Sequence, residues 1–217
     1  QRQSKPMAGK LVLGCIATIA PFLLSTVARE AATQYPDLQL MLREDTSDNL
    51  LGALGRGEVD LVILALPYNT GGFTEVLLGD DVFNLVLHKN IAQTFASSDV
   101  AELPAKSIYL LQKEHCLAEH TQSLCHLFDT TKINPFLATS LQTLVQMVDA
   151  HQGATFLPQM AINSDILHNT DLISRAAEPA TAHRKIAILW RSSSRSEETY
   201  RQLGEIIRSA VAQKCRA

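Results

Sequence analysis

The chain has 217 residues, 46% of them hydrophobic, which is enough for one large core or two smaller ones. Its formal net charge is −3, which argues against a nucleic-acid-binding surface in this part of the protein. It contains no run of about 18 apolar residues, the length that a membrane-spanning helix needs.

Strand and helix patterns alternate along the chain, which predicts an α/β fold with parallel sheets. Residues 1–9 are polar at their start and lack an apolar signal region, so we expect them to be the remnant of a linker. In the first half, strands are expected at residues 10–16, 38–42, 59–66 and 76–87, the last one broken at residues 79–81.

Helices are expected in the first half from Pro21 to Pro36 and at residues 49–56, where Ser47 or Asp48 would cap the helix and Gly57 would end it. In the second half of the chain, the hydrophobic pattern predicts strands at residues 107–111, 153–157 and 185–190. It also predicts helices at residues 140–150, after Pro158, and from Ser196 to about residue 213.

Cys116 and Cys125 lie nine residues apart in a polar segment rich in histidine. On a helix, nine residues rise about 13.5 Å, and the two thiols point to opposite sides. A disulfide requires Cα atoms within roughly 7 Å of each other. A bond between these cysteines would therefore require any helix between them to unfold, which would make the disulfide a conformational switch.

The remaining cysteines, Cys15 and Cys215, bring the total to four, too few and too irregularly spaced for a disulfide scaffold. This predicts a reduced, cytoplasmic protein. Cys15 lies in an apolar strand pattern and is expected in the core, whereas Cys215 is expected to be exposed.

Three segments, residues 14–21, 57–63 and 139–158, together resemble the effector domain of LysR-type transcriptional regulators. The His115-Cys116 pair, with Cys125 nine residues later and the sequence Ala-Thr-Ser-Leu at 138–141, is similar to the OxyR group of peroxide sensors. The resemblance implies two Rossmann-like subdomains of the periplasmic-binding-protein type. Subdomain I would comprise residues 10–82 and 190–217, and subdomain II residues 83–189, including the redox cysteines.

The resemblance also implies an activator of transcription in oxidative stress, not an enzyme. Hydrogen peroxide would oxidise Cys116 to a sulfenic acid, and Cys125 would then form a disulfide with it. The implied partners are DNA, through an N-terminal helix-turn-helix domain that this sequence lacks, and RNA polymerase. The protein would be a homodimer, or a tetramer at full length, with no membrane contact, metal or cofactor.

Two hydroxyl residues match family positions that hold water or peroxide. Thr18 directly follows the first predicted strand, where open α/β sheets bind ligands, and Ser47 precedes the second predicted helix. Both could instead cap helices, and for Ser47 the two roles could coexist.

Three charged or titratable residues are expected to stabilise the Cys116 thiolate or hold the peroxide. His115 is adjacent to the cysteine, Glu119 follows it by three residues, and Arg191 ends a predicted strand. The alternatives are a solvated histidine, a first-turn acid and a solvated arginine.

Glu114 departs from the family pattern, which usually has glycine two residues before the cysteine. We expect Glu114 to tune sensitivity: its charge would raise the thiol pKa, whereas its restricted backbone would keep the pocket assembled.

Three other functions remain open. His115, Cys116, His120, Cys125 and His126 could bind zinc, although a second closely spaced pair is missing. A thiol peroxidase would need the same two cysteines and a route for a reductant. An effector domain that binds a small organic ligand would leave the cysteines incidental.

Overall fold

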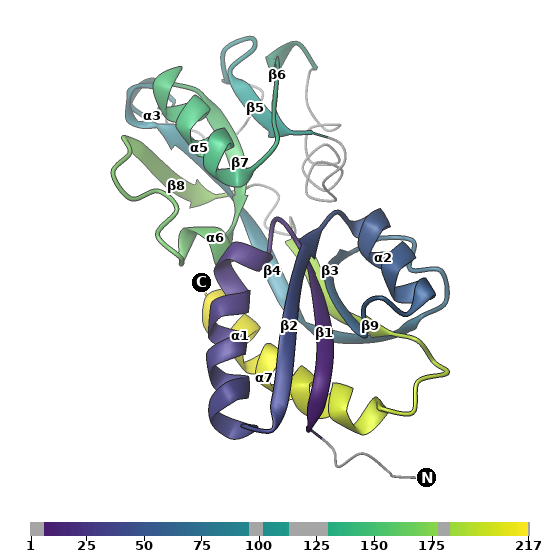
Figure 1. The fold of residues 1–217 in the computed structure, drawn as a ribbon. Helices are drawn as coiled ribbons and strands as arrows, with labels where there is room; N and C mark the ends of the chain where they lie inside the picture. Colours follow the sequence, from purple (N-terminus) through teal and green to yellow (C-terminus); the bar gives the residue numbers. More distant parts are fainter. Residues whose placement is uncertain (1–6, 96–101, 113–129, 178–182, 217) are drawn as a thin grey trace. The chain divides into compact units, whose positions relative to one another are not determined.

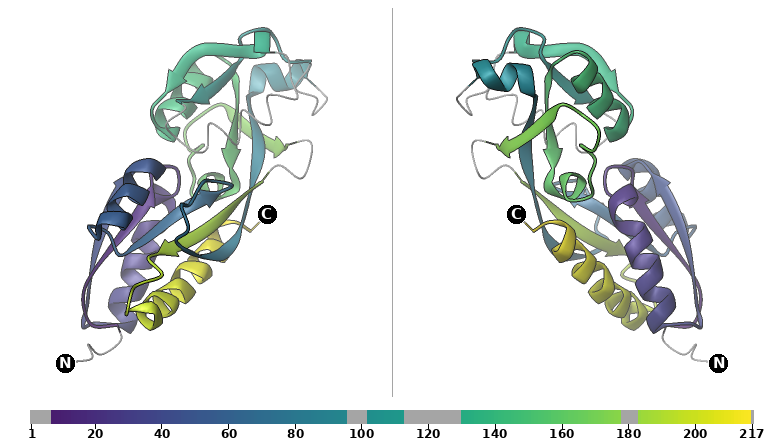
Figure 2. Two further views of the ribbon diagram at one scale, coloured as in Figure 1. Left: turned by 90° about the vertical axis from the view of Figure 1, so that its right-hand side faces the viewer. Right: turned by 90° about the vertical axis from the view of Figure 1, so that its left-hand side faces the viewer.

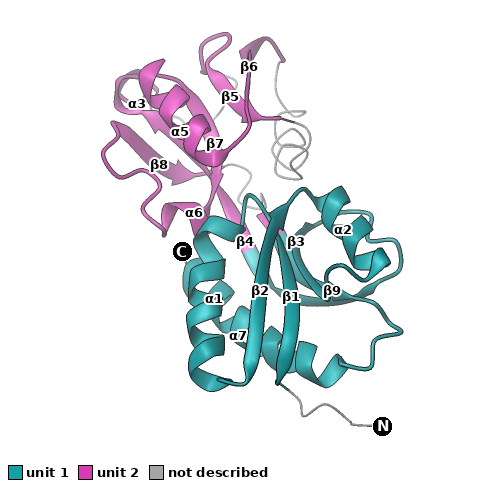
Figure 3. Cartoon of the chain, viewed as in Figure 1, with its two compact units in different colours: residues 1–80, 185–216 teal, residues 81–184, 217 magenta. Residues whose placement is uncertain are grey.

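The computed structural model describes residues 7–95, 102–112, 130–177 and 183–216, which form two compact units (Figure 3). Unit 1 lies within Gln1–Asp80 and Lys185–Arg216, and unit 2 within Asp81–Arg184. The chain thus passes between units at residues 80–81 and 184–185, a few residues before the positions near 82 and 190 that we expected.

Unit 1 is built on a mixed sheet with the strand order β2-β1-β3-β9-β4 (Figure 1). Strands β1 (Gly9–Ile16), β2 (Leu38–Asp45) and β3 (Leu61–Leu66) are parallel, as predicted. Strand β9 (His183–Trp190) is antiparallel to β3 and borders β4 (Thr74–His88). The predicted parallel strands are thus joined by an antiparallel one that the sequence pattern did not indicate, because β9 returns the chain from unit 2 in the opposite direction.

Three helices cover the sheet of unit 1: α1 (Ala20–Gln34), α2 (Ser47–Arg56) and α7 (Glu197–Lys214). Helix α1 connects β1 to β2, and α2 connects β2 to β3 in the opposite direction along the sheet. Because both crossover connections are right-handed, the two helices lie on opposite faces of the sheet. Figure 2 shows α7 lying beside α1. Helix α2 packs closely on β1, because a Cβ atom at Gly14 would come within 2.8 Å of Leu50.

Strand β4 is continuous, so the predicted break at residues 79–81 was wrong. Gly79 allows β4 to pack closely on α7, since a Cβ atom there would lie 3.2 Å from the Val211 side chain of that helix. Asp81 is fully buried yet bonded: it pairs with Arg184, and its Oδ1 accepts a hydrogen bond from the Met160 backbone N–H at 3.0 Å. The polar residues of this stretch thus continue the strand.

Unit 2 is also a mixed sheet. The second half of β4 pairs in antiparallel fashion with β7 (Ala154–Pro158) and β8 (Leu172–Ala176). Strand β5 (Ile108–Leu111) is parallel to β7 and to β6 (Ile133–Ala138). Helices α3 (Lys89–Thr94), α5 (Leu141–Ala150) and α6 (Gln159–Ile162) and a 3₁₀ turn at Thr130–Lys132 complete its described part.

The close fit of α5, β5 and β7 explains Gly153, the residue just before β7. Its Cβ atom would come within 2.6 Å of the Tyr109 ring and 2.8 Å of the Ser107 carbonyl oxygen. A side chain therefore cannot be added here without moving the backbone of the neighbouring strand. The predicted apolar face of α5 is buried at Leu141, Leu144, Val145 and Val148.

Candidate functional site

Thr18 and Ser47 lie at the same edge of the sheet in unit 1. The last residues of the parallel strands β1 and β2, Ile16 and Asp45, are paired, and each hydroxyl residue follows its strand by two positions. Both residues are buried, with 3% and 2% of their surface exposed. The carboxyl edge of parallel strands is where open α/β sheets bind ligands.

Neither hydroxyl caps a helix. The N-cap of α1 is Ile19, which makes no side-chain cap bond. The N-cap of α2 is Thr46, whose Oγ1 accepts a hydrogen bond from the Asn49 backbone N–H at 3.4 Å. The prediction of Ser47 or Asp48 as the cap was wrong, because Thr46 already has the extended backbone of an N-cap.

The Ser47 Oγ atom is buried and has no hydrogen-bond partner within the described part of the chain. An unsatisfied buried hydroxyl costs about 1–3 kcal/mol. Ser47 is also the first residue of α2, where backbone N–H groups and the helix dipole favour a negatively polarised atom. The arrangement suits a small ligand with an oxygen atom.

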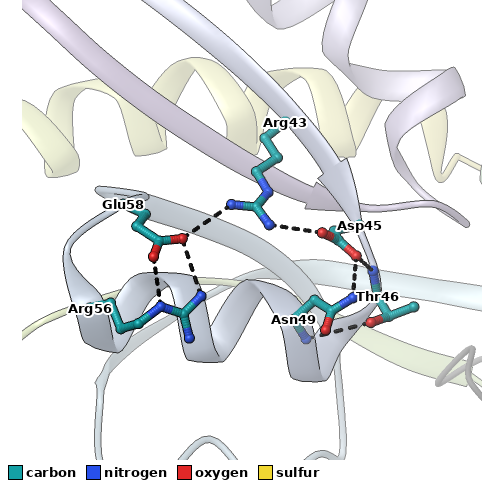
Figure 4. A network of polar contacts seen from close by, with 6 residues as sticks. All are labelled: Arg43, Asp45, Thr46, Asn49, Arg56 and Glu58. Atoms are coloured by element: carbon teal, nitrogen blue, oxygen red, sulfur yellow. Dashed lines mark hydrogen bonds and ion pairs between the residues drawn. The ribbon is translucent and has the colours of Figure 1, made fainter.

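A polar network connects the end of β2 to both ends of α2 (Figure 4). At one end, Asp45 accepts hydrogen bonds from the Asn49 side chain at 2.7 Å, the Thr46 backbone N–H at 2.9 Å and Arg43 at 3.0 Å. The bond from Asn49, followed by those from Arg43 and Thr46, holds the pKa of the Asp45 carboxyl below its usual value, against the opposing effect of burial.

The other end of the network is exposed. Arg56 donates two hydrogen bonds to Glu58, at 2.6 and 3.1 Å, and Arg43 lies 3.6 Å from the same carboxylate. The bond from Arg56 lowers the pKa of Glu58, and the same bond raises the pKa of Arg56. Arg43 thus links the first turn of α2 to the residues that follow the helix.

Arg191 lies at the opposite edge of the sheet from Thr18 and Ser47. Its guanidinium group donates to the backbone carbonyls of Leu54 and Val59 and lies 3.9 Å from Asp60. Asp60 in turn accepts a hydrogen bond from the Val12 N–H, and Val12 lies four residue steps, about 13 Å, before the end of β1 at Ile16. Arg191 therefore supports the end of α2, and its role toward the thiolate stays a prediction.

The sequence analysis missed one buried ion pair. Asp81 and Arg184 are both fully buried in unit 2, and the Arg184 Nη2 atom lies 2.9 Å from the Asp81 Oδ2 atom. The signal was present as charged residues inside two apolar strands, a pattern that normally requires a partner. Loss of either partner would leave a buried, uncompensated charge, which typically costs 3–5 kcal/mol.

The two cysteines predicted to be redox-active, Cys116 and Cys125, lie outside the described residues, as do the predicted site residues Glu114, His115 and Glu119. The residues of the zinc alternative lie there too. The segment that contains them joins the parallel strands β5 and β6 and follows the carboxyl end of β5. Among the described residues, no group of three or more metal-ligating side chains occurs.

The other two cysteines are described. Cys15 is buried in β1, which confirms its expected place in the core. Cys215, which was expected to be exposed, is half-buried at the end of α7. None of the described helices is both long and apolar enough to cross a membrane.

Residues 4–212 match the family described as the LysR substrate binding domain. The chain belongs to this family. Among curated relatives of this LysR domain, the regulator EstR of Acinetobacter baylyi is 33% identical over 213 residues, 98% of this chain and 70% of the relative. The Escherichia coli K12 "DNA-binding transcriptional dual regulator OxyR" is 30% identical over 213 residues, 97% of this chain and 69% of the relative.

Solved structures give the same result. The reduced form of the OxyR2 regulatory domain from Vibrio vulnificus is 45% identical, with a TM-score of 0.88, and the match covers 97% of this chain and 99% of that one. An H₂O₂-bound cysteine-to-serine mutant of Corynebacterium glutamicum OxyR is 27% identical, with a TM-score of 0.84, covering 97% and 67%. The predicted α/β fold of the periplasmic-binding-protein type is confirmed.

Proposed function

We propose that this LysR domain senses hydrogen peroxide for a DNA-binding transcriptional regulator through reversible formation of a Cys116–Cys125 disulfide. The observation that carries the proposal is the 45% identity to an OxyR2 regulatory domain over nearly the whole chain. Several curated relatives, including one from Mycobacterium leprae at 31% identity, are named as hydrogen peroxide-inducible genes activators.

The cysteine segment supplies a second line of support. Two further OxyR2 domains carry a glutamate-to-glycine and a cysteine-to-serine substitution two positions apart. Glu114 and Cys116 have the same spacing in this chain. We infer that Cys116 is the residue that reacts with peroxide and that Glu114 tunes its sensitivity.

The chemistry needs two cysteines and no cofactor. The Cys116 thiolate attacks one oxygen of hydrogen peroxide, so that an S–O bond forms, the O–O bond breaks and hydroxide leaves and takes up a proton. The Cys125 thiolate then attacks the Cys116 sulfur, forming the S–S bond and releasing the sulfenic oxygen as water. The two thiols supply both electrons that reduce peroxide to water.

The buried hydroxyls of Thr18 and Ser47 are the described groups that best fit the peroxide. Ser47 has an unsatisfied oxygen at a helix N-terminus, which can donate to the peroxide oxygen that becomes negative as the O–O bond breaks. Thr18 comes from the neighbouring strand at the same edge. His115 and Glu119 are proposed to complete the pocket from the cysteine segment.

We further propose that the domain acts in the cytoplasm as part of a homodimer, or of a tetramer at full length. DNA would be bound by a separate helix-turn-helix domain, and oxidation would alter contacts with DNA and RNA polymerase. The names of the E. coli OxyR and of EstR support a DNA-binding regulator. The subdomain division expected from the family, residues 10–82 with 190–217 and 83–189, is proposed as the frame of the switch.

EstR supports one alternative function. Its name carries no reference to peroxide, yet it matches 98% of this chain at 33% identity. A LysR domain that binds a small organic ligand at Thr18 and Ser47 would use the same hydroxyls and leave the cysteines incidental. A thiol peroxidase is a second alternative that shares the cysteines.

Titration of the reduced protein with peroxide distinguishes these functions. A sensor loses the thiols of Cys116 and Cys125 once per chain and stops without added reductant. A peroxidase consumes peroxide continuously when a thiol reductant is present. A domain that binds an organic ligand shows neither rapid thiol loss nor turnover, and this result would refute the proposal.

A further inference from the structure

Asp45 occupies the junction between β2 and α2, directly before the residues that carry the candidate site. Its carboxylate holds the Thr46 backbone N–H at 2.9 Å, the Asn49 side chain at 2.7 Å and the Arg43 guanidinium at 3.0 Å. It also ends β2 opposite Ile16, the last residue of β1. One carboxylate therefore connects the strand end with the first turn of the helix (Figure 4).

Ser47 lies between Thr46, the N-cap of α2, and Asn49 in the first turn of the helix, and both of these residues donate a hydrogen bond to Asp45. The Ser47 hydroxyl has no hydrogen-bond partner among the described residues, so its own bonds do not fix its position. The cap bond from the Asn49 N–H to Thr46 is long, at 3.4 Å, whereas the bonds to the Asp45 carboxylate are shorter and charge-assisted. Asp45 thus holds the residue before Ser47 and a residue of the same helical turn, beside the backbone bond from the Leu50 N–H to the Thr46 carbonyl at 3.0 Å.

We infer that Asp45 is a positioning residue, which holds the first turn of α2 so that the Ser47 hydroxyl meets the peroxide oxygen. This inference rests on the proposed function of the site and adds a residue that the sequence analysis did not select. A displacement of about 1 Å in a reacting group can slow a reaction about 100-fold. Asp45→Ala should therefore slow oxidation of Cys116 at least tenfold, whereas Asp45→Asn, which keeps one acceptor oxygen, should slow it less.

The test is a double-mutant cycle on the full chain, with hydrogen peroxide as the oxidant. Wild type, Asp45→Ala, Ser47→Ala and the double variant are compared by their second-order rates of Cys116 oxidation. If Asp45 acts through Ser47, the double variant should be no slower than Ser47→Ala alone. Alkylation of Cys116 by iodoacetamide should keep its wild-type rate, because this reagent does not use the peroxide-binding hydroxyls.

Glu58→Gln is the matched control, since it breaks the opposite end of the same network and leaves the bonds from Thr46 and Asn49 to Asp45 in place. It should react with peroxide at close to the wild-type rate. Additive rate losses in the cycle, an Asp45→Ala variant as fast as wild type, or an equally slow Glu58→Gln variant would each overturn the role of Asp45.

Two further measurements keep the outcome interpretable. Thermal unfolding followed through Trp190, the single tryptophan, shows whether Asp45→Ala is folded, and Asp45→Asn provides the second variant if it is not. A folded Asp45→Asn as slow as Ser47→Ala would show that the charge itself is required and would still support positioning. A wild-type protein without fast peroxide reactivity would overturn the proposed function together with this inference.

Discussion

At the scale of single residues, the Ser47 hydroxyl is buried at the first position of α2, while the adjacent Thr46 caps the helix. A buried hydroxyl without a partner destabilises the folded chain. Functional sites are where such costs are usually found. The cost at Ser47 is offset when a ligand oxygen accepts its hydrogen bond, which is the role that we propose for peroxide.

Replacement of Ser47 by alanine should therefore separate stability from function. We expect Ser47→Ala to unfold at equal or higher urea concentration, with a gain of up to about 1 kcal/mol, because an unsatisfied buried hydroxyl is removed. The same variant should react with peroxide at least tenfold more slowly, by the loss of one donor in the pocket.

Thr46→Ala is the neighbouring control for this prediction. It loses the helix cap and should be destabilised by about 1 kcal/mol. Denaturation followed by Trp190 fluorescence measures both variants. A Ser47→Ala protein less stable than Thr46→Ala would show that the hydroxyl is bonded in the native protein and would contradict the assignment.

Glu114 sets a second prediction at this scale. Its carboxylate can extend into water, where about 1 kcal/mol of its effect on the thiolate survives at close range. Its restriction of the backbone, compared with glycine, cannot be removed in that way. Glu114→Gly should therefore react with peroxide more slowly than wild type, and Glu114→Gln should be close to wild type. A Gln variant faster than wild type would mean that charge decides.

At the scale of elements, α2 is secured at both ends by side chains outside it. Thr46 and Asp45 hold its first turn, and Gly57 ends it in the left-handed conformation at φ 77°, as the sequence predicted. Arg191, from the end of β9, donates to the carbonyls of Leu54 and Val59. A cation at the C-terminal end of a helix is also favoured by the helix dipole.

Arg191→Met should consequently destabilise unit 1 without changing the chemistry. We expect a loss of about 1–3 kcal/mol and a peroxide rate close to wild type. The Val59 carbonyl loses the Arg191 donor, and the Leu54 carbonyl keeps only the Gly57 N–H at 3.2 Å. Arg201→Met is the control, because its exposed i,i+4 pair with Glu197 and the contact of its guanidinium with the Trp190 ring, at 5.8 Å, together contribute about 1 kcal/mol. Circular dichroism reports stability for both. A tenfold slower reaction of Arg191→Met would instead support the predicted role of Arg191 toward the thiolate.

Sequence patterns predicted elements well where hydrophobic periodicity was strong. Helices α1, α5 and α7 and strands β1 to β3 follow the expected ranges within a few residues. Strand β6 was missed because it contains Pro135 and exposes the apolar side chains of Phe136 and Leu137. An edge strand tolerates these features, but they obscure the alternation of apolar and polar residues that marks a strand. The short β8 and α3 gave similarly weak signals.

The site was less predictable than the fold. Thr18 and Ser47 were selected through the family resemblance, and the parallel pairing of β1 with β2 brings both to one edge of the sheet, while their role toward peroxide stays a prediction. Thr46, Ser47 and Asp48 are adjacent residues of types that all cap helices. Which of them is the N-cap depends on backbone angles that the sequence does not show. The antiparallel direction of β9 puts Arg191 at the other edge of the sheet, which its position after an apolar strand pattern did not reveal, and its role toward the thiolate stays a prediction.

At the scale of the whole molecule, β4 and β9 carry the chain from one unit to the other, and Asp81 and Arg184 are the residues of unit 2 at these two crossings. Their buried pair, with the Met160 N–H on the same carboxylate, ties β4, β9 and α6 together. Both crossings are therefore fixed within unit 2 by one bonded cluster.

The two-fold symmetry expected of a DNA-binding regulator predicts how many copies of this chain associate. Regulators that bind pseudo-palindromic DNA are two-fold symmetric, and the effector domain is a natural place to hold the two copies. The chain should therefore be a dimer in light scattering, both reduced and after peroxide treatment. A monomeric mass in both redox states would count against the proposed homodimer.

The central claim, that peroxide links Cys116 to Cys125, is tested most directly by mapping disulfides in peroxide-treated protein by mass spectrometry. After one equivalent of peroxide, the account predicts one dominant cross-linked peptide pair containing Cys116 and Cys125, with Cys15 and Cys215 still reduced. The Cys125→Ser variant should instead accumulate sulfenic acid at Cys116, or its over-oxidised products. Cross-links that involve Cys215, or an unmodified Cys116 after treatment, would contradict the account.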